Sequence, residues 1–408
     1  MTRRLLILTD AIAPPAYAPR IVSLCHYLYG QGWECVVFSD CEQDFEPFAA
    51  DVGTWYQTRY YHSGNYRKQY AKDKLFGARE RYFQAFIERT IEVQNFDAIF
   101  CSTCYFFPLQ TTHRLASKYH KPFVVDLRDI SEQWGDIPFM TQSPLPSQRL
   151  NRWLHRLFTR HNLRMRNRVL RAADAVVTIS PWHRELLARY NPNTHLTYNG
   201  FDESEFTPQD VPSERFVIAY TGKIYDLHFR DPRLLLEAMC ELTSSGQIKP
   251  SDVEIRFHID KGSFEPLRQL VSQYGLSDIC RIEGYIPRTE LLPLMHRASV
   301  LLVLTCQSTP NGAHGIMGTK FYEALGVEKP VLCVRSDEEC LAQVIGETNA
   351  GLAATNADEV KTFLTDKYRE WKQHGFTHQA VDREQKQRFT RQHQAKQLEQ
   401  LFLQCLRR

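Results

Sequence analysis

Short apolar runs alternate with longer amphipathic segments along most of the chain, and this rhythm occurs twice. Short continuous apolar runs predict buried strands, and the amphipathic segments between them predict covering helices. Parallel strands need crossover connections, so a chain of this kind is restricted to α/β folds built from βαβ units. At 408 residues the chain exceeds what one hydrophobic core usually organises, and we expect two domains.

The two series of strands are separated by a stretch without periodicity. Residues 199–214 are rich in proline, acids and turn formers, which indicates a linker and a boundary near 205–215. We predict two Rossmann-like, doubly wound domains facing a central cleft, over 1–205 and 206–380, and a helix in 381–408 that packs back across the cleft onto the N-terminal domain. The predicted strands are residues 5–10, 34–39, 97–102, 123–129, 175–180, 195–200, 216–222, 253–260, 279–285, 299–305, 330–335 and 351–355.

Composition excludes several classes of function. The 50 basic and 47 acidic residues nearly balance, so no overall basic field points to nucleic acid. No stretch approaches the roughly 20 apolar residues that span a bilayer, so any membrane contact would be peripheral. The eleven scattered cysteines contain one isolated CxxC pair, which favours reduced thiols and a cytoplasmic protein over a disulfide framework or a zinc site.

The stretch GIMGTKFYEALGVEKPVL begins at Gly315 and combines glycines, a cation and a carboxylate at a predicted helix start. Ligands of open α/β sheets lie beyond the carboxyl ends of strands, where helix N-termini offer unpaired amides. Gly315 and Gly318 would let backbone approach a phosphate, Lys320 would add charge, and Glu323 would accept hydrogen bonds from ribose hydroxyls. The alternative is a glycine-rich loop followed by a surface ion pair.

A second cationic stretch strengthens the nucleotide interpretation. The predicted strand at 216–222 ends in Gly222 and Lys223, and Arg230 follows one loop later. Lysine and arginine together neutralise a diphosphate well, although either residue alone would be interpreted as a solvated loop cation.

These motifs occur in an order that resembles glycosyltransferase family 4, a group of retaining enzymes with the GT-B fold and nucleotide-sugar donors. The resemblance covers nearly the whole chain. It implies that Lys223 and Arg230 bind the donor pyrophosphate, that Glu323 holds the ribose, and that Tyr285 and Ile286 pack on the base. The segments that carry it are APPAYAPR (13–20), VVDLRDISEQW (124–134), ADAVVTIS (173–180), YNGFD (198–202), YTGKIYDLHFRDP (220–232), EGYIPRTELLPLM (283–295) and GTKFYEALGVEKPVL (318–332).

One position departs from the family pattern. The first glutamate of the family's E-x7-E motif would fall at residue 315, where this sequence has Gly315. That acid usually contacts the transferred sugar, so the departure bears on donor choice, and we interpret it as a variant of the motif. The expected donor-binding set is Gly222, Tyr285, Ile286, Gly315, Gly318, Thr319, Lys320, Glu323 and Arg20.

The N-terminal half is expected to bind the acceptor. Asp126, Arg128 and Asp129 stand at the end of a predicted strand, where the family carries a charged pair. Charges there could orient an acceptor hydroxyl, an acceptor-side role for Asp126 and catalytic roles for Arg128 and Asp129. A capping aspartate with a salt-bridged arginine is the alternative. Arg20 could point at the β-phosphate or be an ordinary surface arginine.

The resemblance implies a front-face displacement in which the leaving phosphate helps to deprotonate the acceptor. No enzymic nucleophile is then needed, and Lys223 and Arg230 would stabilise the leaving diphosphate. Because cations can replace a metal and no metal-ligand spacing occurs, we expect a metal-independent enzyme with a UDP-sugar or GDP-sugar donor.

Residues 148–171 contain eight arginines and no acid, with apolar residues forming an approximate stripe. Such a helix could lie on anionic lipids, or its stripe could dock on its own sheet. The aromatic-rich segment 41–95 is either a surface insertion or a substrate-facing loop.

The expected function is therefore sugar transfer to a glycan or lipid-linked acceptor in cell-surface polysaccharide or lipopolysaccharide synthesis, in the cytoplasm or at the inner membrane face. A sugar-nucleotide epimerase of the same fold and a binding protein without turnover are the alternatives.

Overall fold

The computed structural model describes residues 2–10, 19–41, 48–135, 147–224 and 226–407, and the chain divides into two compact units. Unit 1 comprises Met1–Tyr198 and Arg391–Arg408, and unit 2 comprises Asn199–Thr390. The division after Tyr198 precedes the 205–215 stretch that composition indicated. The reason is that Phe201 and Phe206 are already buried in unit 2.

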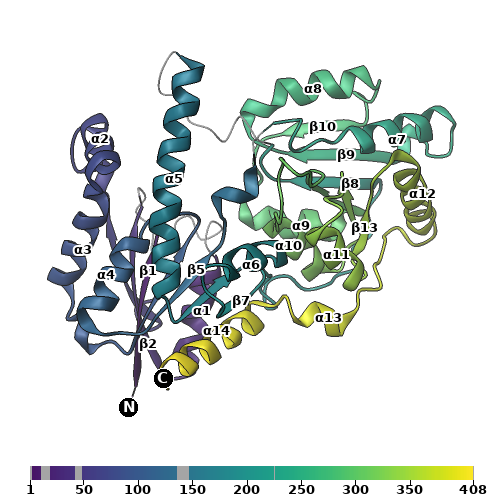
Figure 1. The fold of residues 1–408 in the computed structure, drawn as a ribbon. Helices are drawn as coiled ribbons and strands as arrows, with labels where there is room; N and C mark the ends of the chain where they lie inside the picture. Colours follow the sequence, from purple (N-terminus) through teal and green to yellow (C-terminus); the bar gives the residue numbers. More distant parts are fainter. Residues whose placement is uncertain (1, 11–18, 42–47, 136–146, 225, 408) are drawn as a thin grey trace. The chain divides into compact units, whose positions relative to one another are not determined.

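A parallel sheet forms the centre of unit 1, with seven strands among the described residues (Figure 1). Its strand order is β3-β2-β1-β4-β5-β6-β7. In β1, Leu5, Leu6, Ile7 and Leu8 are fully buried, as expected for a strand covered on both faces. The strands are β1 (Arg3–Thr9), β2 (Trp33–Asp40), β3 (Gly53–Thr58), β4 (Ala98–Thr103), β5 (Phe123–Leu127), β6 (Ala175–Thr178) and β7 (Thr194–Leu196).

Two apolar clusters, one on each face of this sheet, form the core of unit 1. Leu5 and Ile7 belong to the cluster with α1 and α14, whereas Leu6 and Leu8 belong to the cluster with α3, α4 and α6. In α14, Leu398, Leu401, Phe402 and Cys405 are buried at helical spacing. The helices are α1 (Pro19–Gly30), α2 (Tyr66–Phe76), α3 (Ala78–Thr90), α4 (Leu109–Tyr119), α5 (Gln148–Ala172), α6 (Pro181–Ala188) and α14 (Arg391–Cys405).

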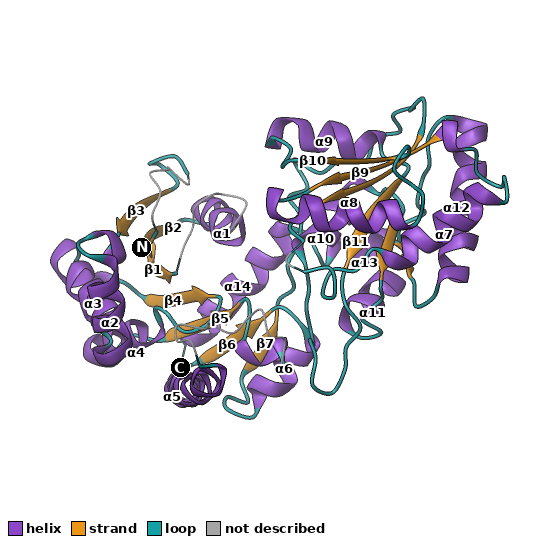
Figure 2. Ribbon diagram, turned by 90° about the horizontal axis from the view of Figure 1, so that it is seen from above, coloured by secondary structure: helices purple, strands orange, loops and turns teal. Residues whose placement is uncertain are grey.

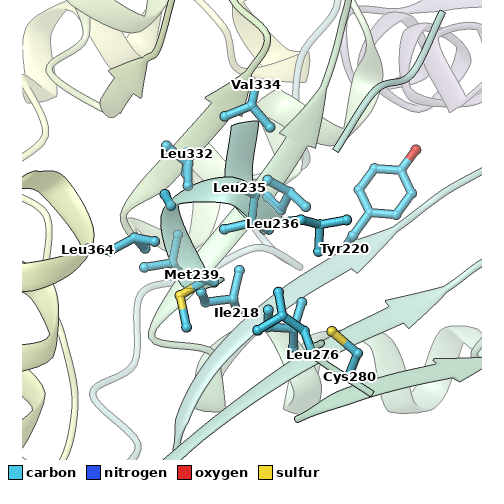
Figure 3. Packing of buried hydrophobic residues seen from close by; sticks show 14 of the residues in the cluster. Ile218, Tyr220, Leu235, Leu236, Met239, Leu276, Cys280, Leu332, Val334 and Leu364 are labelled. Atoms are coloured by element: carbon cyan, nitrogen blue, oxygen red, sulfur yellow. The ribbon is translucent and has the colours of Figure 1, made fainter. Parts of the chain in front are cut away.

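Unit 2 repeats this plan with a parallel sheet of six described strands (Figure 2). Its order is β10-β9-β8-β11-β12-β13. One part of its core packs Ile218 and Tyr220 against Leu235, Leu236 and Met239 of α7 (Figure 3). The strands are β8 (Phe216–Thr221), β9 (Val253–His258), β10 (Cys280–Glu283), β11 (Val300–Leu304), β12 (Val331–Val334) and β13 (Gly351–Ala353). The helices are α7 (Arg233–Ser244), α8 (Phe264–Gln273), α9 (Arg288–Arg297), α10 (Thr319–Val327), α11 (Cys340–Glu347), α12 (Ala357–His374) and α13 (Arg383–Gln387).

Both sheets have the doubly wound order in which the strand sequence reverses at one point. That switch lies between β1 and β4 in unit 1 and between β8 and β11 in unit 2. Ligands of such sheets bind beyond the carboxyl ends of the strands at the switch point. The predicted α/β class with two doubly wound sheets is confirmed. Sequence reasoning missed β3, which lies in the aromatic-rich segment 41–95.

The apolar residues of helix α5 that are buried lie toward its C-terminal end. Val169 and Leu170 contact the sheet, whereas Leu150, Trp153 and Leu157 are exposed. Docking of the apolar stripe on the sheet, one of the two alternatives, is therefore seen for the last turns, and the first turns project beyond the strands of unit 1 (Figure 1). Among the described helices, none is long and apolar enough to cross a bilayer. All eleven cysteines are free thiols.

Candidate functional site

A pocket of about 200 Å³ lies at the switch point of unit 2. Tyr220 and Gly222 contribute from the end of β8, Leu304 and Thr305 from the end of β11, and Gly318 from the start of α10. The volume is below the roughly 300–1,000 Å³ of sites that enclose a whole small ligand. The pocket therefore suits a compact group such as a diphosphate.

Three cations line this pocket: Lys223, Arg230 and Lys320. None of the described residues that line it is an aspartate or a glutamate. Arg230 is held in place because its Nη1 donates to the carbonyl oxygen of Leu304 at 2.9 Å. Three cations that line one pocket, one of them held in a fixed orientation, favour an anionic ligand.

The N-terminus of α10 adds backbone donors to the same pocket. Gly318 occupies the N-cap position, and no side chain hydrogen bond caps the helix there. The first amides of a helix have no partner inside it, and the helix dipole favours an anion at this end. A Cβ atom at Gly318 would meet nothing within 4 Å, so space is open in front of the backbone. Thr319 and Lys320 line the pocket next to it.

Gly315 has a backbone conformation and a hydrogen bond that its sequence position did not predict. Its φ of 62° lies in the left-handed region that favours glycine. Its amide donates to Oε2 of Glu339 at 3.1 Å, and Ser308 donates to the same oxygen at 2.8 Å. The amide of Gly315 is thus engaged by a carboxylate, and Gly315 does not line the cationic pocket.

Glu323 lies one helical turn beyond the pocket, among cations. Its Oε2 is 3.0 Å from Lys320 Nζ, and its Oε1 is 3.5 Å from Arg288 Nη1. The surface ion pair that was the alternative interpretation therefore forms, and Arg288 also orients the carboxylate. Tyr285 is exposed, while Ile286 lines a separate groove of unit 2.

In unit 1, charged residues converge at the carboxyl ends of β1 and β5. Arg128 Nη2 forms an ion pair with Asp10, and Asp129 follows directly in the chain. Burial raises the pKa of Asp129 to about 6, and the Asp10 carboxylate adds to the shift. The side chain of Gln133, 2.9 Å from Oδ1 of Asp129, and the charge of Arg128 oppose it. Asp129 therefore changes charge close to neutral pH.

Asp126 and Arg20 form a buried ion pair at 3.2 Å. Asp126 is fully buried and accepts a hydrogen bond from Ser102 at 2.8 Å. Arg20 Nη1 donates to the carbonyl oxygen of Thr197 at 2.9 Å. These contacts connect α1 with β5 and with the residue that follows β7. Both charged groups are buried, and the expected acceptor-side role of Asp126 and donor-binding role of Arg20 stay predictions. Most of the APPAYAPR motif lies outside the described residues.

Comparison with known proteins gives a fold and a family match over part of the chain. Residues 19–205, slightly less than half of the chain, match the sequence profile of Glycosyltransferase Family 4. The structure resembles sucrose-phosphate synthase from Thermosynechococcus elongatus, with a TM-score of 0.67, 15% identity, and coverage of 98% of this chain and 99% of the other. This chain has the GT-B fold.

Other solved structures share this fold. HepE of Anabaena, in complex with UDP and glucose, has a TM-score of 0.64 at 15% identity, and 98% of each chain is covered. The lipopolysaccharide outer core galactosyltransferase WaaB has a TM-score of 0.57 at 14% identity, with 98% of this chain and 99% of the other covered. No curated protein sequence matches the chain significantly.

The structure brings together six predicted site residues in one pocket: Gly222, Lys223, Arg230, Gly318, Thr319 and Lys320. Sequence reasoning missed Asp10, Arg288 and Glu339. Asp10 ends a buried strand, a signal that could have identified it, whereas no local pattern connects Glu339 with Gly315 or Arg288 with Glu323. Among the described residues, no group of three or more histidine, cysteine, aspartate or glutamate side chains could hold a metal ion.

Proposed function

We propose that this chain is a glycosyltransferase that transfers a sugar from a UDP-sugar or GDP-sugar to a hydroxyl acceptor, with retention of the anomeric configuration. The observation that supports the donor class is the cationic pocket of unit 2, where Lys223, Arg230 and Lys320 lie beside the start of α10. The complexes of HepE with UDP add support, since HepE has the same fold.

The proposed chemistry needs charge stabilisation more than an enzymic nucleophile. When the bond between the sugar and the diphosphate breaks, negative charge grows on the leaving phosphate. Lys223, Arg230 and the amides of α10 would bind that charge more tightly in the transition state than in the ground state, which accelerates the reaction. The leaving phosphate would accept the proton of the acceptor hydroxyl on the same face as the departing group, and this gives retention.

We propose that these cations supply the neutralisation without a metal ion. A metal chelator should leave the rate within about twofold, whereas Lys223→Ala should lower kcat by about 10²–10³-fold, the range seen when one preorganised donor of this kind is removed. Proton NMR of the first product would distinguish retention from inversion by its anomeric coupling constant.

Donor binding can be measured by thermal shift with UDP, GDP and ADP. A ligand that binds only the folded protein at a concentration of 100 times its Kd stabilises it by about 2.7 kcal/mol. We expect UDP or GDP to raise Tm, and Lys223→Ala and Glu323→Ala each to abolish most of the increase. Lys261→Ala, at a lysine of unit 2 outside the pocket, is the matched control.

Two outcomes would contradict the proposal. If both site variants kept the full shift, the pocket would not be the donor site. If donor bound but was never consumed with any acceptor, the chain would be a nucleotide-sugar binding protein.

We further propose a role in cell-surface polysaccharide or lipopolysaccharide synthesis, with peripheral contact between α5 and an anionic membrane. WaaB, which has the same fold, acts on the lipopolysaccharide outer core according to its name. The exposed first turns of α5 carry Leu150, Trp153 and Leu157 beside arginines, the pattern of helices that lie in the headgroup region.

Vesicle flotation tests this contact. The protein should float with vesicles that contain an anionic phospholipid and remain at the bottom with neutral ones. Arg152→Glu with Arg156→Glu should abolish flotation, whereas the same charge change at Arg268 and Arg369, both exposed in unit 2, should not. Equal flotation of both double variants would exclude α5 as the contact.

A further inference from the structure

A second pocket, of about 500 Å³, lies within unit 1 at its own switch point. Asp10 lines it from the end of β1 and Thr103 from the end of β4. The pocket therefore reaches the ion pair of Asp10 and Arg128. Its position relative to the unit 1 sheet matches the position of the cationic pocket relative to the unit 2 sheet.

One side of this pocket is apolar and open to solvent. Leu75 and Phe76, at the end of α2, are 67% and 66% exposed, and Phe158 of α5 is 37% exposed. All three line the pocket, together with Met165 of α5. Large apolar side chains that are exposed together around one cavity, rather than singly, mark a binding surface.

The other side carries groups that bind hydroxyls. Asp10 and Gln110 offer a carboxylate and an amide, and Tyr105 lies beside them in the lining. Such convergent polar groups next to aromatic rings suit a saccharide, whose hydroxyls need hydrogen bonds and whose ring faces are apolar.

Arg79 also lines the pocket, and two contacts fix its position. Its Nε is 2.5 Å from Oδ2 of Asp40 at the end of β2, and its guanidinium stacks over the ring of Phe107 at 3.7 Å. Tyr61 donates to Asp73 at 2.7 Å on the same rim. Because the charge of Arg79 is paired with Asp40 within the protein, Arg79 shapes the pocket without demanding a charged ligand.

We propose that this pocket binds the acceptor as an amphiphile, a saccharide that carries an apolar chain. The saccharide lies near Asp10 and Thr103, and the first segment of the chain lies between the end of α2 and the middle of α5. This inference rests on the proposed function for its interpretation as the acceptor site, and it names the acceptor class that the function leaves open.

The test uses alkyl β-glucosides of increasing chain length as probes, from methyl to octyl, below their micellar concentrations. Binding of each probe to the whole polypeptide, without donor, is measured by isothermal titration calorimetry. We expect the Kd to fall at least tenfold between methyl and octyl glucoside, and 1-octanol, which lacks the saccharide, to bind more weakly than octyl glucoside.

Matched variants locate the binding position of the acceptor's apolar chain. Phe76→Ala with Phe158→Ala should remove most of the chain-length dependence, because both side chains line the pocket. Tyr66→Ala with Trp153→Ala removes exposed aromatic surface from the same two helices outside the pocket and should preserve the dependence.

A Kd independent of chain length in the unmodified protein would overturn the proposal, as would equal losses in the two double variants. The thermal shift with UDP or GDP, measured on the same protein, reports on unit 2 alone. If donor binding fails while the glucoside series behaves as expected, the proposed function is at fault and the amphiphile site remains.

Discussion

At the scale of single residues, Asp129 connects structure with pH. Burial raises the pKa of Asp129 to about 6, so its carboxylate loses charge as the pH falls through that value. If the anion orients the acceptor, kcat/KM should fall about tenfold for each pH unit below 6.

The pH–rate profile of Asp129→Asn provides the check. The variant should be slower at pH 8 and should lack the acidic limb with a midpoint near 6. An unchanged acidic limb in the variant would assign the titration to another group.

Gly326 shows why one small residue fixes the position of a whole helix. A Cβ atom there would lie 2.6 Å from Cβ of Phe206 and 2.9 Å from the ring of Phe201. Gly326→Ala should therefore destabilise the protein by about 1–3 kcal/mol, the usual cost of overpacking, and weaken UDP or GDP binding by displacing α10.

The comparison variant is Gly346→Ala in α11, where a Cβ atom would meet nothing within 4 Å. Alanine should be neutral there or stabilise by up to about 1 kcal/mol because of its helix propensity. Urea denaturation measures both variants, and equal effects would refute the packing argument.

At the scale of elements, Glu80 connects α3 with the start of α4. Its carboxylate accepts hydrogen bonds from the amide and hydroxyl of Thr111, at 2.8 and 2.6 Å, and burial raises its pKa. Glu80→Ala leaves these donors without their partner in a buried site and should cost about 1–3 kcal/mol in urea denaturation. Glu88→Ala, on the same helix, removes a partly exposed ion pair with Lys118 and a hydrogen bond from Tyr119, and should change stability less.

Prediction of the elements from sequence worked where the signal was local. The run Leu5–Leu8 is apolar because both faces of the sheet are covered. A continuous apolar run of this kind can be recognised as a buried strand from the sequence alone. Strand β3 was missed because it is a half-buried edge strand with Trp55, Tyr56 and Gln57 mixed in one run.

The site was predictable to the same extent and for the same reason. Lys223, Arg230 and Lys320 follow strand ends or open a helix, so the topology alone brings them to one edge. Contacts such as Arg20 with Asp126 join residues far apart in sequence, and no local pattern distinguishes a buried arginine from one that faces a ligand.

At the scale of the whole molecule, the path of the chain makes α14 part of unit 1. The ring of Phe402 packs against Trp33 and Phe100, with centroids 6.2 and 5.3 Å away, and Glu399 accepts from Trp33 Nε1 at 3.0 Å. Phe402→Ala should cost about 3–5 kcal/mol, whereas Gln404→Ala, at an exposed position of the same helix, should be nearly neutral. Thermal denaturation followed by tryptophan fluorescence would report both, and a neutral Phe402→Ala would show that α14 contributes little.

The packing of α14 on unit 1 also has a consequence for folding during synthesis on the ribosome. Unit 1 is synthesised first, but α14 packs against α1 and follows unit 2 in the sequence. One face of α1 therefore lacks its neighbour until all of unit 2 has been synthesised. A nascent chain stalled within unit 2 therefore exposes apolar surface of unit 1, where chaperones or proteases would engage it. Synthesis of unit 1 therefore begins before that of unit 2 and ends after it.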